Sequence, residues 1–143
     1  MIRVLIDTNV VLDALASREP FRADAEKLFM LAAEETFQGF VTANSVTDIY
    51  YLIRKSVSDV AAREGIRNLL QLFSVIDITG EDCEAALDSP VVDYEDALVA
   101  VCAVKIGIEY IVTRDEEFLQ APAGVPVVSL EALLETLKQP HCV

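Results

Sequence analysis

The sequence predicts a three-layer α/β/α fold, Rossmann-like, in which helices cover both faces of a five-stranded parallel sheet. Short apolar runs alternate with longer segments whose apolar residues recur at helical spacing. This alternation is typical of parallel strands joined by right-handed crossovers. The chain has 143 residues, of which 53% are hydrophobic, enough for one sizeable core. We therefore expect a single domain over residues 1–143.

Five runs have the character of buried strands, because each is short, apolar and bounded by polar or turn residues. They are Ile2–Ile6, Gly39–Thr42, Ser74–Ile78, Glu109–Thr113 and Val125–Val128. Five such strands most often form two halves that diverge from the first strand, which gives the order 3-2-1-4-5. A ligand crevice then opens at the carboxyl ends of strands 1 and 4, where the order reverses.

Helical spacing accounts for most of the remaining chain. Ser58 and Thr79 are expected N-caps, since their hydroxyl oxygens can accept hydrogen bonds from first-turn N–H groups. The segment Asp93–Ile106 is apolar nearly all round after its first turn, which indicates burial between layers or in a dimer interface. The other expected helices are a short one after the first strand, 21–35, 44–55, 58–72, 79–87 and a last one striped by Leu130, Leu133, Leu134 and Leu137.

Composition narrows the possible functions. Twenty-four acidic residues against eleven basic ones give a net charge of −13, whereas proteins that bind nucleic acid through many phosphates carry basic surfaces. Tight non-specific binding is therefore not expected, although phosphate contacts within one patch fit this charge. No apolar run approaches the roughly 20 residues of a membrane span, and a signal-peptide pattern is missing. We expect a full-length cytoplasmic chain without a membrane segment.

Cysteine and histidine usage excludes further chemistry. Cys83, Cys102 and Cys142 show no C-x-x-C spacing, so we expect neither a disulfide framework nor a structural zinc site. His141 is the only histidine, which argues against histidine-based catalysis.

Four aspartates fall where the predicted topology brings chain segments to one edge of the sheet. Asp7 follows the first strand, and Asp115 lies two residues past the fourth. Asp48 lies about one turn into the helix after the second strand, and Asp96 is in the first turn of the helix before the fourth. Clustered carboxylates raise one another's pKa, and a divalent cation relieves that repulsion. Oxygen ligands suit Mg²⁺ or Mn²⁺, and one or two such ions activate water in phosphodiester hydrolysis.

Helix capping is the alternative explanation for these acids. Asp is a preferred N-cap, and acids favour the first helical turn. Asp7, Asp115 and the pair Asp93 and Asp96 could each do nothing more than satisfy helix N–H groups. Their coincidence at one sheet edge favours a site. Asp48 has no helix end to cap and is the acid that capping explains least.

Three stretches of this chain resemble, in order, the signature motifs of PIN-domain proteins, a family that includes the VapC-type ribonuclease toxins. They are Ile6-Asp7-Thr8-Asn9, Asp93-Tyr94-Glu95-Asp96-Ala97-Leu98 and Ile111-Val112-Thr113-Arg114-Asp115-Glu116-Glu117-Phe118. The resemblance covers essentially the whole chain. It implies a PIN-like fold and catalytic roles for all four aspartates.

The resemblance further implies that Asp7, Asp96 and Asp115 bind the metal. Asp48 occupies a position where many members carry Glu, so its shorter side chain is expected to act through a water. Groups that orient the acids or a phosphate are implied at Thr8, Asn9 and Thr113, and accessory acids at Asp93 and Glu95. A cap and a favourable first-turn charge explain Asp93 and Glu95 equally well.

Substrate contacts follow from position alone. Arg114 adjoins Asp115 and is the best candidate for a substrate phosphate. Exposed basic residues are often merely solvated; the other candidates are Arg18, Arg22, Arg54 and Lys55. Tyr50 and Tyr51 have rings that can stack on a base, but Tyr50 lies on the apolar face of its helix and is expected in the core.

The resemblance implies a Mg²⁺- or Mn²⁺-dependent endoribonuclease, the toxin of a type II toxin-antitoxin pair, leaving 5′-phosphate and 3′-hydroxyl ends. An antitoxin partner and a homodimer are implied with it. One alternative keeps the fold as a catalytically inactive RNA- or protein-binding module. Another is a phospho-acceptor receiver domain, which needs paired acids after strand 1, an Asp after strand 3 and a Lys after strand 5. Here Asp77 is expected inside strand 3, and residues 125–129 contain no Lys.

Overall fold

A computed structural model describes residues 1–138 and contains one parallel sheet with the order β3-β2-β1-β4-β5. Its strands are β1 (Arg3–Ile6), β2 (Gln38–Thr42), β3 (Ser74–Ile76), β4 (Tyr110–Val112) and β5 (Val127–Val128). β1 lies in the middle, where Leu5 is in register with Phe40 of β2 and Ile111 of β4. The predicted strand order is confirmed.

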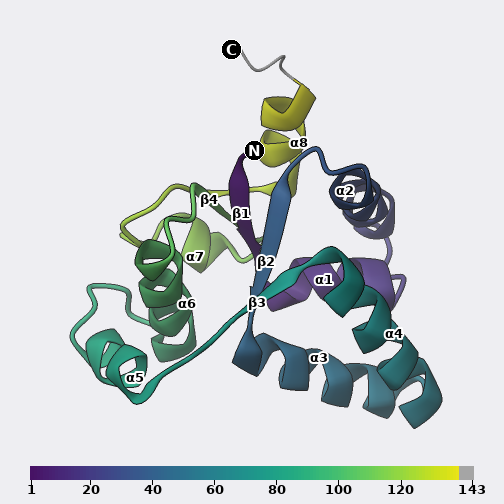
Figure 1. The fold of residues 1–143 in the computed structure, drawn as a ribbon, viewed down its shortest axis with the longest axis horizontal. Helices are drawn as coiled ribbons and strands as arrows, with labels where there is room; N and C mark the ends of the chain where they lie inside the picture. The colour runs from purple at the N-terminus through teal and green to yellow at the C-terminus, as the bar shows by residue number, and fades with distance from the viewer. Residues whose placement is uncertain (139–143) are drawn as a thin grey trace.

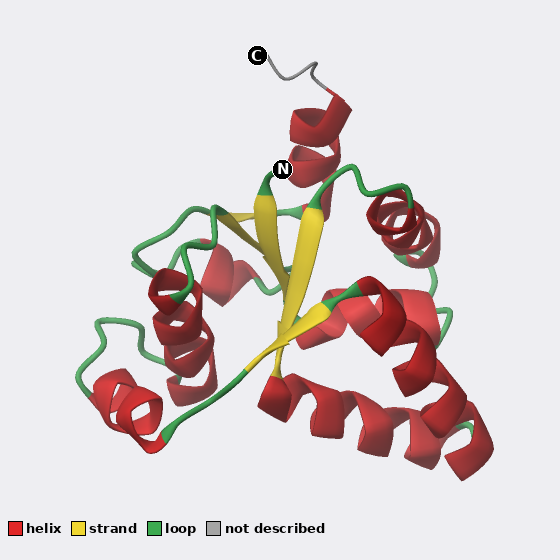
Figure 2. Ribbon diagram, viewed as in Figure 1, coloured by secondary structure: helices red, strands yellow, loops and turns green. Residues whose placement is uncertain are grey.

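Helices cover both faces of this sheet (Figures 1 and 2). One face carries α1 (Thr8–Leu15), α2 (Arg22–Ala33), α3 (Ala43–Ser56), α4 (Asp59–Leu72) and α8 (Leu130–Lys138). The other carries α5 (Gly80–Leu87), α6 (Tyr94–Lys105) and α7 (Glu116–Leu119). The predicted three-layer α/β/α arrangement is therefore confirmed.

Two apolar cores separate the sheet from its helices. Successive side chains of a strand point to opposite faces, so Val4 and Ile6 enter the core under α1–α4, whereas Leu5 enters the core under α5–α7. All three are at most 1% exposed. Burial on both faces explains why the strands read as continuous apolar runs.

The predicted helices end within two residues of the observed ones. Ser58 Oγ accepts a hydrogen bond from Ala61 N at 3.0 Å, and Thr79 forms a capping box with Asp82, as expected for N-caps. Helix α6 buries half of its twelve residues against the second core, and Val104 stays 56% exposed. The expectation of burial between layers is confirmed.

Four strands are shorter than predicted, β1 by one residue and β3, β4 and β5 by two each. β3 ends at Ile76, opposite Thr42, because β2 ends there and offers no further partner. Asp77 therefore follows β3, and its predicted place inside the strand was wrong. β5 comprises only Val127–Val128, the two residues that pair with β4. Residues 125–129 contain no Lys, so the chain lacks the lysine that a receiver domain requires after strand 5.

Among residues 1–138, no helix combines the length and apolar character needed to cross a bilayer. Cys83 and Cys102 are free thiols. The predictions about His141 and Cys142 concern positions outside the described residues.

Gly39 of β2 provides a test of the packing between the sheet and α4. A Cβ at this position would lie 2.2 Å from Cδ1 of Phe73, a ring that is 3% exposed. Overpacking of this kind costs about 1 to 3 kcal/mol, so Gly39→Ala is expected to lower the free energy of unfolding, measured by urea denaturation. Gly80→Ala is the matched control, because no atom lies within 4 Å of its added Cβ. Equal stability of the two variants would contradict the packing.

Candidate functional site

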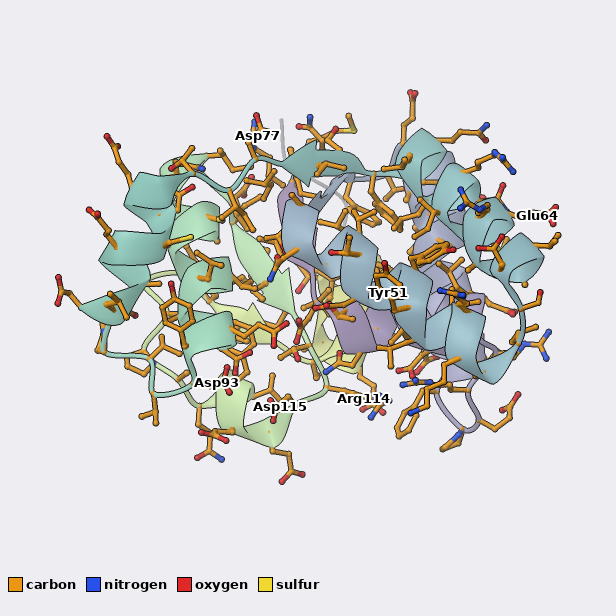
Figure 3. All side chains as sticks on the ribbon, turned by 90° about the horizontal axis from the view of Figure 1, so that it is seen from below. Tyr51, Glu64, Asp77, Asp93, Arg114 and Asp115 are labelled. Carbon is orange, nitrogen blue, oxygen red and sulfur yellow. The ribbon has the colours of Figure 1, made fainter. Side chains whose placement is uncertain are left out.

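A cleft of about 740 Å³ opens at the edge of the sheet where the parallel strands end, the edge that faces the viewer in Figure 3. Four acids line it: Asp7, Asp48, Glu95 and Asp96. They come from the end of β1, from α3 and from the first turn of α6. Three of the four aspartates predicted from the sequence therefore share one cleft, and Asp115 lies at the same edge, near Asp93 (Figure 3).

Asp7 is held firmly in place. It is the N-cap of α1, and its Oδ1 accepts a hydrogen bond from Thr8 N at 2.9 Å. Its Oδ2 accepts one from the Thr113 hydroxyl at 2.8 Å. Burial raises the pKa of Asp7, while these two hydrogen bonds oppose that change. Asp7 therefore does cap a helix, as the alternative explanation states, but the cap engages only one of its two carboxylate oxygens.

Thr113 connects Asp7 with the chain segment that carries Asp115. Its buried hydroxyl donates to Asp7 and lies 3.3 Å from Asn9 Nδ2, which donates to it. The same oxygen accepts from Asp115 N at 3.1 Å. Asn9 and Thr113 therefore make the contacts expected of groups that orient the acids.

Thr8 points elsewhere, to a residue that the sequence analysis did not identify. Its hydroxyl lies 2.6 Å from the Ser45 hydroxyl in the first turn of α3. Ser45 is 5% exposed and lies three residues before Asp48, on the same side of the helix. Its only sequence signal is that spacing. The pair fixes α3, and with it Asp48, against the start of α1.

The first turn of α6 concentrates negative charge. Asp93 is the N-cap, and its Oδ1 accepts from Asp96 N at 3.0 Å. Burial, followed by repulsion from Asp93, Asp7 and two further acids, raises the pKa of Asp96 to about 7. Burial and a contact with Asp48 raise the pKa of Glu95. Glu95 and Asp48 therefore face each other across the cleft.

Asp115 caps α7, since its Oδ1 accepts from Glu117 N at 3.1 Å. It is exposed and does not line the cleft itself. Its charge nevertheless contributes to raising the pKa of both Asp7 and Asp96. Asp7, Asp96 and Asp115 thus form one electrostatic group, with Asp115 at its rim, and Asp48 adjoins this group through Glu95.

The two fully buried acids outside the cleft have cationic partners, whereas the half-buried Asp7 and Asp96 inside it do not. Asp82 lies 2.5 Å from Lys105 Nζ, which lowers the pKa of Asp82. Asp13 lies 2.7 Å from Arg114 Nε. Within residues 1–138, neither Asp7 nor Asp96 forms an ion pair. Asp7 accepts two hydrogen bonds, which leave its charge uncompensated. A cation bound in the cleft would supply the missing charge.

The carboxylates suit a hard divalent ion such as Mg²⁺ or Mn²⁺ in ligand type and charge. As they stand, no three acidic, histidine or cysteine side chains in the described part of the chain are arranged to hold an ion together. Mg²⁺ does not require such a cage, because it keeps several waters and takes one or two protein carboxylates. Asp7 and Asp96 fit this mode of binding.

Arg114 does not occupy the position proposed for it from the sequence. Its Nε and second guanidinium nitrogen donate to Asp13 at 2.7 and 2.9 Å, and the guanidinium lies 4.1 Å above the Phe21 ring. Asp13 is 1% exposed, so it requires this partner. Arg114 is absent from the lining of the acidic cleft. It fastens the Thr113–Asp115 segment to α1, and its predicted contact with a substrate phosphate stays a prediction.

The cleft is also lined by Leu12, Arg18, Tyr51 and Leu52. Tyr51 is 59% exposed, whereas Tyr50 packs against the first core, as predicted, with its hydroxyl on Asp59. Of the other basic candidates, Arg22 pairs with Glu26 at 2.7 Å. Arg54 and Lys55 are exposed at the end of α3.

The Asp13–Arg114 pair is expected to stabilise the fold. Arg114→Met would leave a buried carboxylate without its counter-charge, at a cost of about 3 kcal/mol. Lys138→Met removes an exposed pair with Glu135 and should change stability by no more than about 0.5 kcal/mol. Urea denaturation of both variants measures the difference. Similar small losses in both would show that Asp13 is not dependent on Arg114.

The free energy of unfolding is expected to depend on pH through Asp96. Its folded pKa of about 7 exceeds the ordinary value of 3.8, so its contribution to stability is lost as the pH rises from 4 to 7. Asp96→Asn removes that loss. Without divalent ions, this variant should be more stable than the wild type at pH 8 by about 1 to 2 kcal/mol, after allowance for solvent screening. The gain should vanish near pH 4. A gain independent of pH would contradict the raised pKa.

Comparison with known proteins places this site in a family context. The model of the PIN domain matches residues 3–117. A comparison with curated proteins finds no match.

Several solved structures share the fold. VapBC2 from Rickettsia felis, bound to a DNA fragment from its promoter, is 14% identical with a TM-score of 0.69, over 90% of this chain and 98% of that one. VapC20 from Mycobacterium tuberculosis, described as a sarcin-ricin loop cleaving toxin, is 16% identical with a TM-score of 0.66, over 80% and 92%. DNA-bound VapBC from Salmonella typhimurium is 18% identical with a TM-score of 0.66, over 91% and 99%.

These identities are low, so the solved structures support the fold alone, whereas the family match spans most of the chain. Together they confirm the resemblance found in the three sequence motifs. The chain belongs to the PIN-domain family.

Proposed function

We propose that this protein is a Mg²⁺- or Mn²⁺-dependent endoribonuclease that hydrolyses RNA phosphodiester bonds as the toxin of a toxin-antitoxin pair. The observation that carries the proposal is the uncompensated charge of the cleft. Asp82 and Asp13 have cationic partners, whereas Asp7 and Asp96 have none in the described residues and the pKa of Asp96 rises to about 7. A folded protein keeps such a cluster at a cost, which a bound cation offsets.

The site residues have distinct parts in the proposed reaction. Asp7 and Asp96 would hold one ion, with Asp48 and Asp115 reaching it through waters or holding a second. A bound ion of this kind activates a water and stabilises the leaving oxygen. Thr113 and Asn9 keep Asp7 and the Asp115 segment in fixed orientation.

Glu95 is suited to a different task from the metal-binding acids. Burial and the neighbouring Asp48 raise the pKa of Glu95, so it keeps its proton more readily than an exposed carboxyl group. We propose Glu95 as an accessory acid in the cleft that donates a proton to the leaving 3′ oxygen. That oxygen would then depart as a hydroxyl, and the phosphate would remain on the 5′ end of the other fragment.

The toxin assignment rests on the solved structures that share this fold. Similar structures include VapBC assemblies from Rickettsia felis and Salmonella typhimurium and a toxin-antitoxin complex from Klebsiella pneumoniae. VapC20 is described as cleaving the sarcin-ricin loop. An antitoxin partner, an RNA substrate and a homodimer are therefore part of the proposal. A catalytically inactive binding module is the competing candidate, and it would not need the acids to remain unpaired.

Cleavage of RNA by the purified protein tests this proposal. With Mn²⁺ the wild type should cut RNA, and Asp7→Asn and Asp96→Asn should each reduce the rate by about a hundredfold or more, because each removes charge that stabilises the transition state. Asp88→Asn, at the exposed end of α5, is the matched control and should retain the wild-type rate. Calorimetry should show Mn²⁺ binding to the wild type and to Asp88→Asn but much weaker binding to Asp96→Asn.

Two results would reject the nuclease. One is a folded wild type that leaves all RNA intact with Mn²⁺ or Mg²⁺. The other is equal cleavage by wild type and Asp96→Asn, which would point to a contaminating enzyme.

A further inference from the structure

Arg18 and Tyr51, which line the same cleft as the acids, have the chemistry of a nucleotide site. We propose that Arg18 and Tyr51 bind one nucleotide of a single-stranded RNA segment next to the scissile phosphate, with the base stacked on the Tyr51 ring and its phosphate held by Arg18. This inference rests on the proposed ribonuclease function and names residues that recognise its substrate.

Among residues 1–138, Arg18 is the one cationic side chain that lines the cleft, which four acids also line. Its backbone is fixed, since its N donates to Asp13 O at 3.1 Å and its O accepts from Phe21 N at 3.0 Å. Its side chain is exposed and takes part in none of the ion pairs or side-chain hydrogen bonds of residues 1–138. Because the acids repel a polyanion, this free guanidinium decides where a phosphate can enter the cleft.

Tyr51 presents an exposed aromatic ring in a fixed position. It lies three residues after Asp48 on α3, so both side chains project from the same side of the helix. Its ring meets Tyr50 edge to face, with centroids 5.0 Å apart at 84°. This geometry leaves at least one face of Tyr51 free of Tyr50. The ring is 59% exposed, and Figure 3 shows it on the open side of α3.

Contacts behind Tyr50 hold this arrangement. The Tyr50 hydroxyl donates to Asp59 of α4, and the Arg63 guanidinium lies 5.6 Å from the Tyr50 ring. Tyr50 is therefore anchored from α4, and Tyr51 is anchored through Tyr50. An aromatic ring that is ordered before binding loses less conformational entropy when a ligand stacks on it.

The combination of an exposed ring, one free cation and a nearby acidic cluster favours an unpaired nucleotide over other occupants. Bases inside an A-form duplex are stacked on one another and cannot offer a face to Tyr51. A basic polypeptide would be drawn to the acids but repelled by Arg18. Stacking accepts any base, so this site contributes affinity and register more than sequence preference.

Fluorescence anisotropy with a labelled single-stranded RNA of about eight nucleotides tests the proposal in the Asp96→Asn background, measured without divalent ions so that the RNA stays intact. Tyr51→Ala should weaken binding about tenfold, whereas Tyr51→Phe, which keeps the ring, should stay within about twofold. Arg18→Gln should weaken binding about fivefold and reduce the salt dependence by about one phosphate contact. Lys27→Gln, an equal charge change at an exposed position of α2, is the matched control and should bind as the parent does.

An abasic scan separates stacking from an indirect effect on the fold. Removing the stacked base should weaken binding to the parent and leave binding to Tyr51→Ala unchanged, because the variant has already lost that contact. Thermal denaturation checks that each variant is folded.

The proposal is overturned if Tyr51→Ala and Arg18→Gln bind as the parent does, if Lys27→Gln weakens binding as much as Arg18→Gln, or if the parent does not bind RNA. It is also overturned if a basic peptide binds at Arg18 and Tyr51 and RNA does not. Cleavage by the wild type is measured separately, so an active nuclease with unaffected variants rejects only this site. Binding through Arg18 and Tyr51 without any cleavage rejects only the nuclease.

Discussion

The pairing of β1 between β2 and β4 is the constraint on which the rest of the structure depends. It continues one residue past the end of β1, where Asp7 N donates to Val112 O at 3.0 Å. That hydrogen bond places Asp7 beside the segment that leaves β4, and the Thr113 hydroxyl completes the connection. On the other side of β1, strand β2 leads into α3 at the same edge, where the Thr8 and Ser45 hydroxyl groups lie next to each other. The acidic cleft is thus a consequence of parallel strands that end together.

The molecule treats its fully buried acids and the half-buried acids of the cleft in opposite ways. Asp13 and Asp82 are neutralised by Arg114 and Lys105, and these pairs fasten α1 to the β4–α7 segment and α5 to α6. Asp7 has only hydrogen-bond donors as partners, and Asp96 is surrounded by other acids that raise its pKa. The contrast argues that the charge in the cleft is retained for an external partner. The proposed action on RNA is compatible with the net charge of −13, because a bound cation and a few contacts would take the place of a basic surface.

Local patterns in the sequence were sufficient for most of the fold. Alternating strand and helix signals gave the order of the sheet, and capping residues such as Ser58 and Thr79 located helix starts. The ends of β3 and β5 could not be predicted in this way, because a strand stops where its neighbour stops, and that neighbour is distant in sequence. The cleft acids were found because the topology sends the ends of several parallel strands to one edge.

Side-chain contacts between residues far apart in the sequence could not be predicted. Arg114 was assigned to a phosphate because it adjoins Asp115, yet its partner Asp13 lies 101 residues away. The only available signal was an aspartate inside the apolar run of α1, which needs a cation when buried. The sequence signal for the Ser45 contact was weaker still, since small polar residues are common in first helical turns. Such contacts depend on packing between elements, which no local pattern records.

The central claim is that the cleft acids are a cation site. NMR titration of the Asp96 carboxyl carbon measures it most directly, with and without Mg²⁺. The account predicts a pKa of about 7 in the metal-free protein, falling by roughly two units or more when Mg²⁺ is present, because a bound cation stabilises the carboxylate. A pKa that Mg²⁺ leaves unchanged would contradict the account.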